Sequence, residues 1–306
     1  MKKLALRPAP SDEGERLDRF ISRAGGVSRG EARRVLERGG VWIEGKRVKV
    51  ASRLVRAGQD VLVVLEEAGR AARPAAELSA GRILYEDASL VAVDKPPFVA
   101  AQATLGSDEG NLLALVSAHL GGEAGLVHRL DLETSGVTVF GKTRMATRAL
   151  AGAFREGTAH KRYLAIAFGE LIDEGRVETP LSPDLQRKGR YLAVAGGKMP
   201  AATRYKVLGR KGRLCALAAF PETGRTHQIR VHLTSLGAPL VGDALYGGPK
   251  QIETDAGPSR VERVLLHARE LQLPHPETGE PLRILAPVPT DLAWGLGLVG
   301  VDPADV

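Results

Sequence analysis

The stretch "HRLDLETSGV", residues 128–137, places four ionisable side chains within six positions and then a Ser-Gly turn. It runs directly into "GVTVFGKT", where Val137, Val139 and Phe140 favour a pleated strand. Such a density of charge at the entrance of an apolar strand is typical of either a solvated loop or a functional site. The question is which of the two it is, and what one aspartate, Asp131, could do there.

A nucleotide-binding loop is the first alternative, because residues 136–143 fit the pattern G-x-x-x-x-G-K-[ST]. That motif needs a strand, then a flexible loop whose amides hold phosphate, then a helix. Here the four middle residues are Val-Thr-Val-Phe, which favour the strand itself, and "HRLDLETS" upstream has no strand pattern. We therefore rank an NTPase third among the hypotheses, and ATP binding would decide it.

Metal, triad and glycosidase chemistry also find little support around this stretch. His128 and Asp131 are three positions apart, while His227 and His232 are five apart and do not share a helix face. No H-E-x-x-H set and no G-x-S-x-G turn is present. Glu133 lies two residues from Asp131 and we expect it to point elsewhere, so the two do not form a glycosidase pair. We predict no metal site.

Composition bounds the remaining possibilities. The 306 residues are 43% hydrophobic, which allows a real core, and carry a formal net charge of +7 with a pI of about 9.6. This balance favours a polyanionic partner, nucleic acid before membrane. The single cysteine, Cys215, excludes an internal disulfide and a cysteine-rich zinc site. We find no apolar run of membrane length and no signal peptide in "MKKLALRPAP", and we expect a soluble, cytoplasmic protein.

The first part of the chain predicts a small unit of two helices and a β-hairpin. "ERLDRFISRAGG" has helical apolar spacing and ends at Gly25-Gly26, and Ser28 with Glu31 forms a capping box at the next helix. "VWIEGKRVKV" predicts a hairpin turning at Glu44-Gly45, and "GQDVLVV" a last strand. The Ala-rich stretch 66–80 predicts a linker.

This small unit is markedly basic. Residues 12–65 contain twelve Lys and Arg against eight Asp and Glu, which is four of the chain's seven excess charges. In element order and over "RLDRFISRAGGVSRGEARRVLERGGVWIEGKRV" it resembles the RNA-binding module named after ribosomal protein S-four. The alternative is a solvated basic face. The predicted RNA-binding residues are Arg29, Arg33, Arg34, Lys46 and Arg47.

Beyond residue 81, short strands and helices alternate irregularly, with strands often following strands, which predicts an α+β fold with a mixed, mostly antiparallel sheet. We expect a helix in "RMATRALAGAFREG" ended by Gly157, and a hairpin turned at residues 210–212. We also expect a helix in "THQIRVHLTSLG" with Thr226 as its N-cap.

In "HRLDLETSG" the chain resembles the RluA-type pseudouridine synthases, whose signature is H-R-L-D-x-x-T-S-G. Four further stretches fit the same family in the expected order. They are "YEDASLVAVDKP" (85–96), "HKRYLAI" (160–166), "TGRTHQIRVHLTSLGAPLVGDALYG" (223–247) and "LLHARELQLPHP" (265–276). The resemblance covers nearly all of residues 81–290, and the N-terminal RNA-binding module is a common companion in that family.

The resemblance implies a reaction that isomerises uridine in RNA without redox change, metal or cofactor. Asp131 matches the family's catalytic aspartate, Arg230 the arginine that pairs with it, and Tyr163 the residue that stacks on the extruded uracil. A carboxylate that loses solvent needs a cation beside it, which makes the Arg230 assignment chemically sensible. Helical spacing leaves Arg230 off the apolar face of its helix and therefore free to reach the site. An ordinary surface arginine is the alternative.

Other roles follow from the same resemblance. Arg129 resembles the residue that fills the gap left by the flipped base, although a phosphate contact is its plainer role. Leu266, or its neighbour Leu265, would cover the other side of the uracil, and Thr134 would mainly shape the turn that presents Asp131. The predicted substrate-binding set is Arg129, His128, Leu266, Thr134 and His227.

The sequence thus predicts a monomeric RNA pseudouridine synthase with large-subunit ribosomal RNA as its substrate. Transfer RNA is the main rival substrate, and a catalytically silent RNA-binding or assembly protein is the alternative from another class. "KPPFVAAQATLG" and "PETGRTHQ" depart from the family pattern beside the expected RNA channel, which bears on substrate choice. The predicted divisions are a tail (1–12), the RNA-binding domain (13–65), the linker (66–80) and the catalytic domain (81–306).

Overall fold

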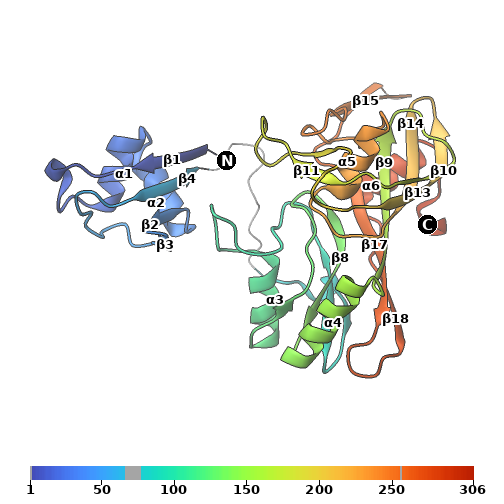
Figure 1. The fold of residues 1–306 in the computed structure, drawn as a ribbon, viewed down its shortest axis with the longest axis horizontal. Helices are drawn as coiled ribbons and strands as arrows, with labels where there is room; N and C mark the ends of the chain where they lie inside the picture. The colour runs from blue at the N-terminus through green and yellow to red at the C-terminus, as the bar shows by residue number, and fades with distance from the viewer. Residues whose placement is uncertain (1, 66–76, 256) are drawn as a thin grey trace. The chain divides into compact units, whose positions relative to one another are not determined.

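A computed structural model describes residues 2–65, 77–255 and 257–306, so most of the predicted linker lies outside the described residues. The chain forms two compact units, one of residues 1–78 with 98–119 and the other of residues 79–97 with 120–306 (Figure 1). The segment 98–119, expected in the catalytic domain, is therefore grouped with the N-terminal unit. No described helix is long and apolar enough to cross a membrane.

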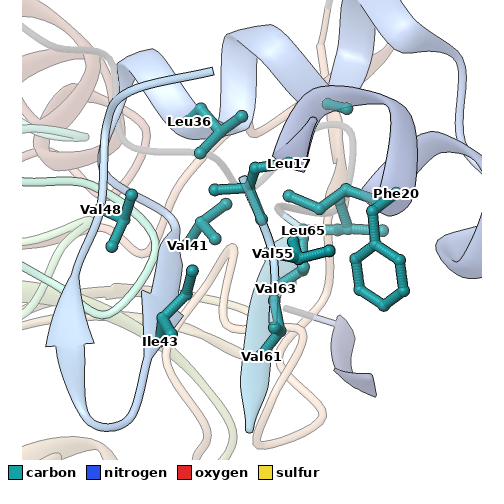
Figure 2. Close-up of a cluster of buried hydrophobic side chains, with 12 residues drawn as sticks. Leu17, Phe20, Leu36, Val41, Ile43, Val48, Val55, Val61, Val63 and Leu65 are labelled. Atoms are coloured by element: carbon teal, nitrogen blue, oxygen red, sulfur yellow. The ribbon is translucent and has the colours of Figure 1, made fainter. Parts of the chain in front are cut away.

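The N-terminal unit packs two helices on a four-stranded sheet of order β1-β4-β2-β3. Leu17, Phe20 and Ile21 on one helix meet Leu36 and the inward valines of the strands in a single core (Figure 2). The elements of the unit are β1 (Lys2–Leu6), α1 (Leu17–Gly25), α2 (Arg29–Glu37), β2 (Val41–Ile43), β3 (Lys46–Arg47), β4 (Val61–Leu65) and α3 (Leu112–Leu120).

The local signals of this unit are confirmed. Gly26 ends α1 in the left-handed region, and the Ser28 side chain accepts a hydrogen bond from the Glu31 amide at the start of α2. Glu44 and Gly45 both have positive φ, as a tight two-residue hairpin turn requires. The predicted tail is wrong in part, because Lys2–Leu6 forms β1 and pairs antiparallel with β4. The free edge of β4 decides this pairing, and it is not visible in the local sequence.

The second unit is built on a ten-stranded sheet of order β10-β13-β14-β9-β17-β8-β6-β5, with β18 and β7 paired at its side. All its pairings are antiparallel except that of β8 with β17. The fold is α+β, as predicted. Its elements are β5 (Ile83–Glu86), β6 (Leu90–Lys95), β7 (Gly125–Leu126), β8 (Ser135–Gly141), α4 (Arg144–Glu156), β9 (His160–Phe168), β10 (Glu174–Val177), β11 (Leu181–Pro183), β12 (Tyr191–Ala193), β13 (Thr203–Lys211), β14 (Leu214–Pro221), α5 (Gln228–Ser235), β15 (Gln251–Thr254), β16 (Gly257–Arg260), β17 (Leu266–Pro274), β18 (Pro281–Leu285) and α6 (Thr290–Gly297).

Strand β9 shows how the two faces of this sheet are covered. Its alternate residues Ala165 and Ala167 share a core with Ile229 and Leu233 of α5, while Leu164 and Ile166 share another with Leu292 and Leu296 of α6. This follows from the two-residue period of a strand that is buried on both sides. Helix α4 covers β6, β8 and the far part of β17 through Leu150 and Ala153 (Figure 1).

Two local details of the second unit differ from the prediction. The β13–β14 hairpin turns at Gly212 and Arg213, because Lys211 already pairs with Leu214. The N-cap of α5 is His227, not Thr226, and His227 has a left-handed backbone. The residues 137–140 that could have formed a nucleotide-binding loop lie within strand β8, which excludes that motif.

Candidate active site

The sheet brings the predicted site residues together from four distant segments. The parallel pairing of β8 with β17 sets the loop that carries Asp131 beside Leu266, the first residue of β17. Tyr163 on β9 pairs with Ala268 of β17 and with Ala219 of β14, the strand that leads toward α5 and Arg230. A cavity of about 850 Å³ opens at this junction. Its lining includes His128, Arg129, Asp131, Thr134, Tyr163, His227, Arg230 and Leu266.

Asp131 is held by an arginine that serves two carboxylates. Arg230 Nη1 donates to Asp131 Oδ2 at 3.1 Å, while its Nε and Nη2 donate to the two oxygens of Asp243 at 2.7 and 2.9 Å. Asp243 is fully buried, and the Arg230 side chain is 8% exposed. Burial alone would lower the pKa of Arg230, but the hydrogen bonds to Asp243 and the charge of Asp131 outweigh it and raise that pKa. The guanidinium therefore stays charged beside Asp131, and the surface-arginine alternative is wrong.

Tyr163 and Leu266 form the apolar wall of the same cavity. Burial, together with the negative charge of Asp131, raises the pKa of the Tyr163 phenol, so the ring remains neutral. A neutral aromatic ring and an aliphatic side chain that line one cavity suit the binding of a flat base. Leu265, the other candidate, is buried in the core under α6 and is absent from the lining of this cavity.

The loop that presents Asp131 is fixed from behind by buried charges. Arg263, 2% exposed, donates to the Glu133 carbonyl at 3.1 Å and forms a double ion pair with Asp291. Glu133 itself accepts the Val264 amide at 3.0 Å. Lys95, fully buried, donates to the Leu132 carbonyl at 3.2 Å. These contacts fix the two residues that follow Asp131, Leu132 and Glu133, which helps to place the carboxylate precisely.

Burial lowers the pKa of Lys95 to about 7, although the negative charge of Asp131 acts in the opposite direction.

The turn that follows the Asp131 loop depends on Gly136, where φ is 114°. A side chain there would place its Cβ 2.2 Å from the Ala268 carbonyl oxygen. The Gly of the T-S-G sequence is thus required by the close approach of β8 to β17.

The remaining predicted residues of this stretch differ in character. His128 Nε2 accepts the Val139 amide at 3.0 Å, and its ring stacks on Phe154 with centroids 4.4 Å apart. Burial lowers the pKa of His128 to about 3, so it is neutral. Arg129 is exposed and reaches Thr226 Oγ1 at 3.4 Å. Thr134 donates its amide to the Asp131 carbonyl, which supports its predicted role in the turn.

His227 completes the side of the cavity next to Arg230. Its Nε2 lies 3.9 Å from Asp131 Oδ2, and its Nδ1 lies 3.0 Å from the hydroxyl of Tyr246. Burial lowers the pKa of His227, with partial opposition from Asp131. The Arg230 guanidinium also lies over the Tyr246 ring, 5.1 Å from its centroid. Tyr246 therefore supports both residues that adjoin Asp131.

Sequence reasoning missed several residues of this assembly, namely Lys95, Lys161, Asp243, Tyr246 and Arg263. Asp243 and Tyr246 lie in "VGDALYG", within a stretch already matched to the family, and an aspartate in so apolar a segment was the available signal. Lys161 lines the cavity, donates to the Thr223 carbonyl at 2.8 Å, and has its pKa lowered to about 8 by burial. Arg263 carried no local signal.

On the N-terminal unit, the predicted basic residues divide into two groups. Asp18 is fully buried and receives Nε of Arg29 and of Arg33 at 3.0 Å and Nε of Arg16 at 3.1 Å. Burial alone would raise the pKa of Asp18, but these hydrogen bonds outweigh it and hold the pKa well below its usual range. One carboxylate thus organises three guanidinium groups whose side chains remain partly exposed.

Arg47 belongs to the second group. Its guanidinium donates to the Thr104 carbonyl and lies over the Trp42 ring, 4.6 Å from the centroid, within the same unit. Arg34 and Lys46 are exposed on α2 and on the hairpin. The structure therefore gives Arg29 and Arg33 a shared, preorganised setting, whereas Arg47 is 18% exposed and engaged inside the unit.

The buried histidines make the stability of this protein depend on pH. His267, fully buried, has its pKa lowered to about 4 by burial. The unfolded chain takes up that proton below about pH 6.5, so the free energy of unfolding should fall as pH drops from 6.5 toward 4. Between pH 6.5 and 5, this histidine alone should lower the free energy of unfolding by about 2 kcal/mol. Urea denaturation at half-unit pH intervals measures it.

His267→Asn is the matched variant, because it keeps a polar side chain near Ser135 but cannot be protonated. Its free energy of unfolding should fall less steeply as the pH drops. The slope against pH should correspond to the uptake of about one proton fewer on unfolding. Identical slopes for the variant and the wild type would show that His267 does not titrate as described.

Comparison with known proteins adds independent information. A family model described as RNA pseudouridylate synthase matches residues 89–235, and one described as S4 domain matches residues 15–61. Ribosomal large subunit pseudouridine synthase D of Nitrosomonas europaea is 37% identical over 265 residues, which cover 82% of this chain and 76% of that protein. The protein of the same name from Pseudomonas aeruginosa is 32% identical, covering 85% and 86%.

A third relative and a solved structure point to the same family. The Bacillus subtilis protein named uncharacterized RNA pseudouridine synthase YhcT is 36% identical, covering 82% of this chain and 84% of that protein. Among solved structures, human RNA pseudouridylate synthase domain containing 4 aligns with a TM-score of 0.55 at 25% identity, covering 70% of this chain and 91% of the human one. The fold of this solved structure agrees with the fold described above.

Proposed function

Since the chain belongs to the RluA-type family of RNA pseudouridine synthases, we propose that it isomerises specific uridines of large-subunit ribosomal RNA to pseudouridine. The observation that carries the proposal is the Asp131 carboxylate, paired with the buried Arg230 and facing a cavity walled by Tyr163 and Leu266. The relatives named after the large ribosomal subunit support the choice of RNA. We also infer that it acts in the cytoplasm, since the relatives named after the large ribosomal subunit are bacterial.

The proposed chemistry uses one carboxylate. The uridine leaves its stack to enter the cavity, where its base lies between Tyr163 and Leu266. Asp131 then either bonds to C1′ as the N1–C1′ bond breaks, and is released when C5 attacks C1′, or takes the C2′ proton as that bond breaks and later returns it. The uracil rotates, C5 bonds to C1′, the C5 proton is lost to solvent, and N1 gains a proton. Arg230 keeps the carboxylate ionised and oriented throughout.

The other residues of the cavity have supporting roles in this proposal. Arg129, exposed at the rim, contacts phosphate or takes the place of the flipped base. Thr134 and the contacts of Glu133 hold the Asp131 loop, and His128 fixes that loop to β8 through the Val139 amide. All of these groups come from one chain, which supports action as a monomer.

The experiment that tests the function is a map of pseudouridine in ribosomal and transfer RNA from cells with and without the protein. Loss of one or more large-subunit sites, restored by the wild-type gene, is the expected result. Loss confined to transfer RNA would overturn the choice of substrate, and an unchanged map in both RNAs would favour a silent binding protein.

The N-terminal unit is proposed to add RNA affinity through the arginines around Asp18. Since one carboxylate serves three guanidiniums, replacing Arg29 and Arg33 with Gln should remove about two phosphate contacts. The slope of log affinity against log salt should then flatten by about 1.5, as filter binding at several salt concentrations would measure. Arg23→Gln is the control, because that side chain pairs with Asp12 and Glu15. Equal slopes for all proteins would refute the assigned role.

A further inference from the structure

His227 occupies a backbone conformation that its side chain does not explain. It has φ 58° and ψ 16°, immediately before α5, and its side chain makes no capping hydrogen bond to the helix. Glycine adopts this conformation freely, whereas an L-residue there costs about 1–2 kcal/mol, and Asn, Asp and His are the side chains found there most often. Such strain persists where the surrounding structure holds the residue for another purpose.

The ring of His227 is held by two tyrosines. Its Nδ1 lies 3.0 Å from the Tyr246 hydroxyl, and it makes edge-on contacts with the Tyr246 and Tyr191 rings at 5.6 and 6.0 Å. The Tyr246 hydroxyl accepts the Tyr191 amide at 2.9 Å. Because an amide can only donate, the hydroxyl proton is left to be given away, and His227 Nδ1 is the acceptor within reach. The ring then carries its proton on Nε2.

The surroundings of Nε2 on the other side of the His227 ring support the same tautomer. Nε2 lies 3.9 Å from Asp131 Oδ2, and a carboxylate favours an N–H over a lone pair at that position. This separation is too long for a hydrogen bond, and the same oxygen already receives Arg230 at 3.1 Å. The Nε2–H group therefore faces the cavity next to the reacting carboxylate with capacity for a further acceptor.

We propose that His227 donates its Nε2–H to an oxygen of the bound uridine beside Asp131, and that Tyr246 is the positioning residue that fixes this tautomer. This inference rests on the proposed function and specifies, for a residue already predicted to bind substrate, the donating atom, its tautomer and the residue that fixes it. Burial keeps the imidazole neutral, so its effect is that of an oriented donor rather than of a charge.

Two substitutions separate this role from a backbone role, because they predict opposite rankings. In His227→Gln the side-chain amide reaches the position of Nε2, whereas in His227→Asn it reaches that of Nδ1. Asn suits the left-handed backbone better than Gln does. If His227 mattered for the backbone alone, Asn would be the more active variant. As a donor, Gln should stay within about 10-fold of the wild-type single-turnover rate, and Asn should lose on the order of 100-fold.

RNA affinity, measured by filter binding, should change by less than a few-fold in both variants, since phosphate contacts dominate it. Tyr246→Phe should slow the single-turnover rate without weakening RNA binding, because the ring loses the group that orients it. In the wild-type protein, ¹⁵N spectra of labelled histidine should show His227 protonated on Nε2.

An Asn variant at least as active as Gln, or a wild-type His227 protonated on Nδ1, would overturn the inference. Should the Gln variant fail to fold, Tyr246→Phe at wild-type rate would overturn it equally. If the wild-type protein modified none of the RNAs tested, the proposed function itself would be refuted. The two failures are therefore distinguishable.

Discussion

An Asp131→Asn variant is expected to bind RNA within a few-fold of the wild-type affinity and to convert uridine at least roughly 10⁴-fold more slowly. The amide has the shape of the carboxylate and can still lie beside Arg230, but it can act neither as nucleophile nor as base. Binding should survive because Lys and Arg on phosphates and stacking supply the affinity. Tritium release from 5-labelled uridine in single turnover, beside a filter-binding titration, measures both quantities.

Glu222→Gln is the matched control for this experiment. Glu222 also lines the cavity, but its carboxylate pairs with Arg176 and Arg204 on the outer strands. Removing that charge should leave tritium release within a few-fold of the wild type. Wild-type release from Asp131→Asn would mean that another group performs the chemistry, and the assignment of this site would fail.

The sequence predicted those elements whose ends are marked locally. Helix α4 ends at Gly157 with positive φ, α2 begins at a Ser28 cap, and β8 is a run of β-favouring residues. Each of these signals lies within a few residues of the feature it specifies. Prediction therefore succeeded wherever propensity and capping agreed with the tertiary structure.

Elements set by distant partners were not predicted. Strand β1 exists because β4 offers an edge some sixty positions later in the chain, and the local sequence of residues 2–6 carries no sign of that partner. The parallel pairing of His267 with Ser135 likewise joins residues far apart in sequence. That pairing creates the cavity, so its geometry could not be obtained from periodicity.

The features of the candidate site likewise divide into those that were predicted from the sequence and those that depend on distant partners. Asp131, Tyr163 and Arg230 followed from the resemblance, and the structure brings all three to one cavity. Helical spacing placed Arg230 off the apolar face of α5 but did not predict its burial. Arg230 is buried because α5 packs on the sheet and its guanidinium pairs with Asp243. The spacing of residues within the helix cannot reveal a buried partner such as Asp243, which comes after the helix in the sequence and folds back against it.

Arg230→Lys is expected to lose on the order of 100-fold or more in single-turnover rate while the protein remains folded. The guanidinium uses two N–H groups for Asp243 and a third for Asp131. A lysine ammonium is a single point charge, so it would settle at the buried Asp243 and leave Asp131 without its hydrogen bond. Tritium release and thermal unfolding together test this expectation.

Removing the charge altogether separates stability from catalysis. Arg230→Met should lower the free energy of unfolding by roughly 3–5 kcal/mol, because Asp243 would remain buried and uncompensated. The double variant Arg230→Met with Asp243→Asn removes both charges and should recover most of that loss, as urea denaturation would show. It should nevertheless remain as inactive as the single variant, since Asp131 still lacks its cation. Recovery of activity along with stability would mean that Arg230 serves the fold alone.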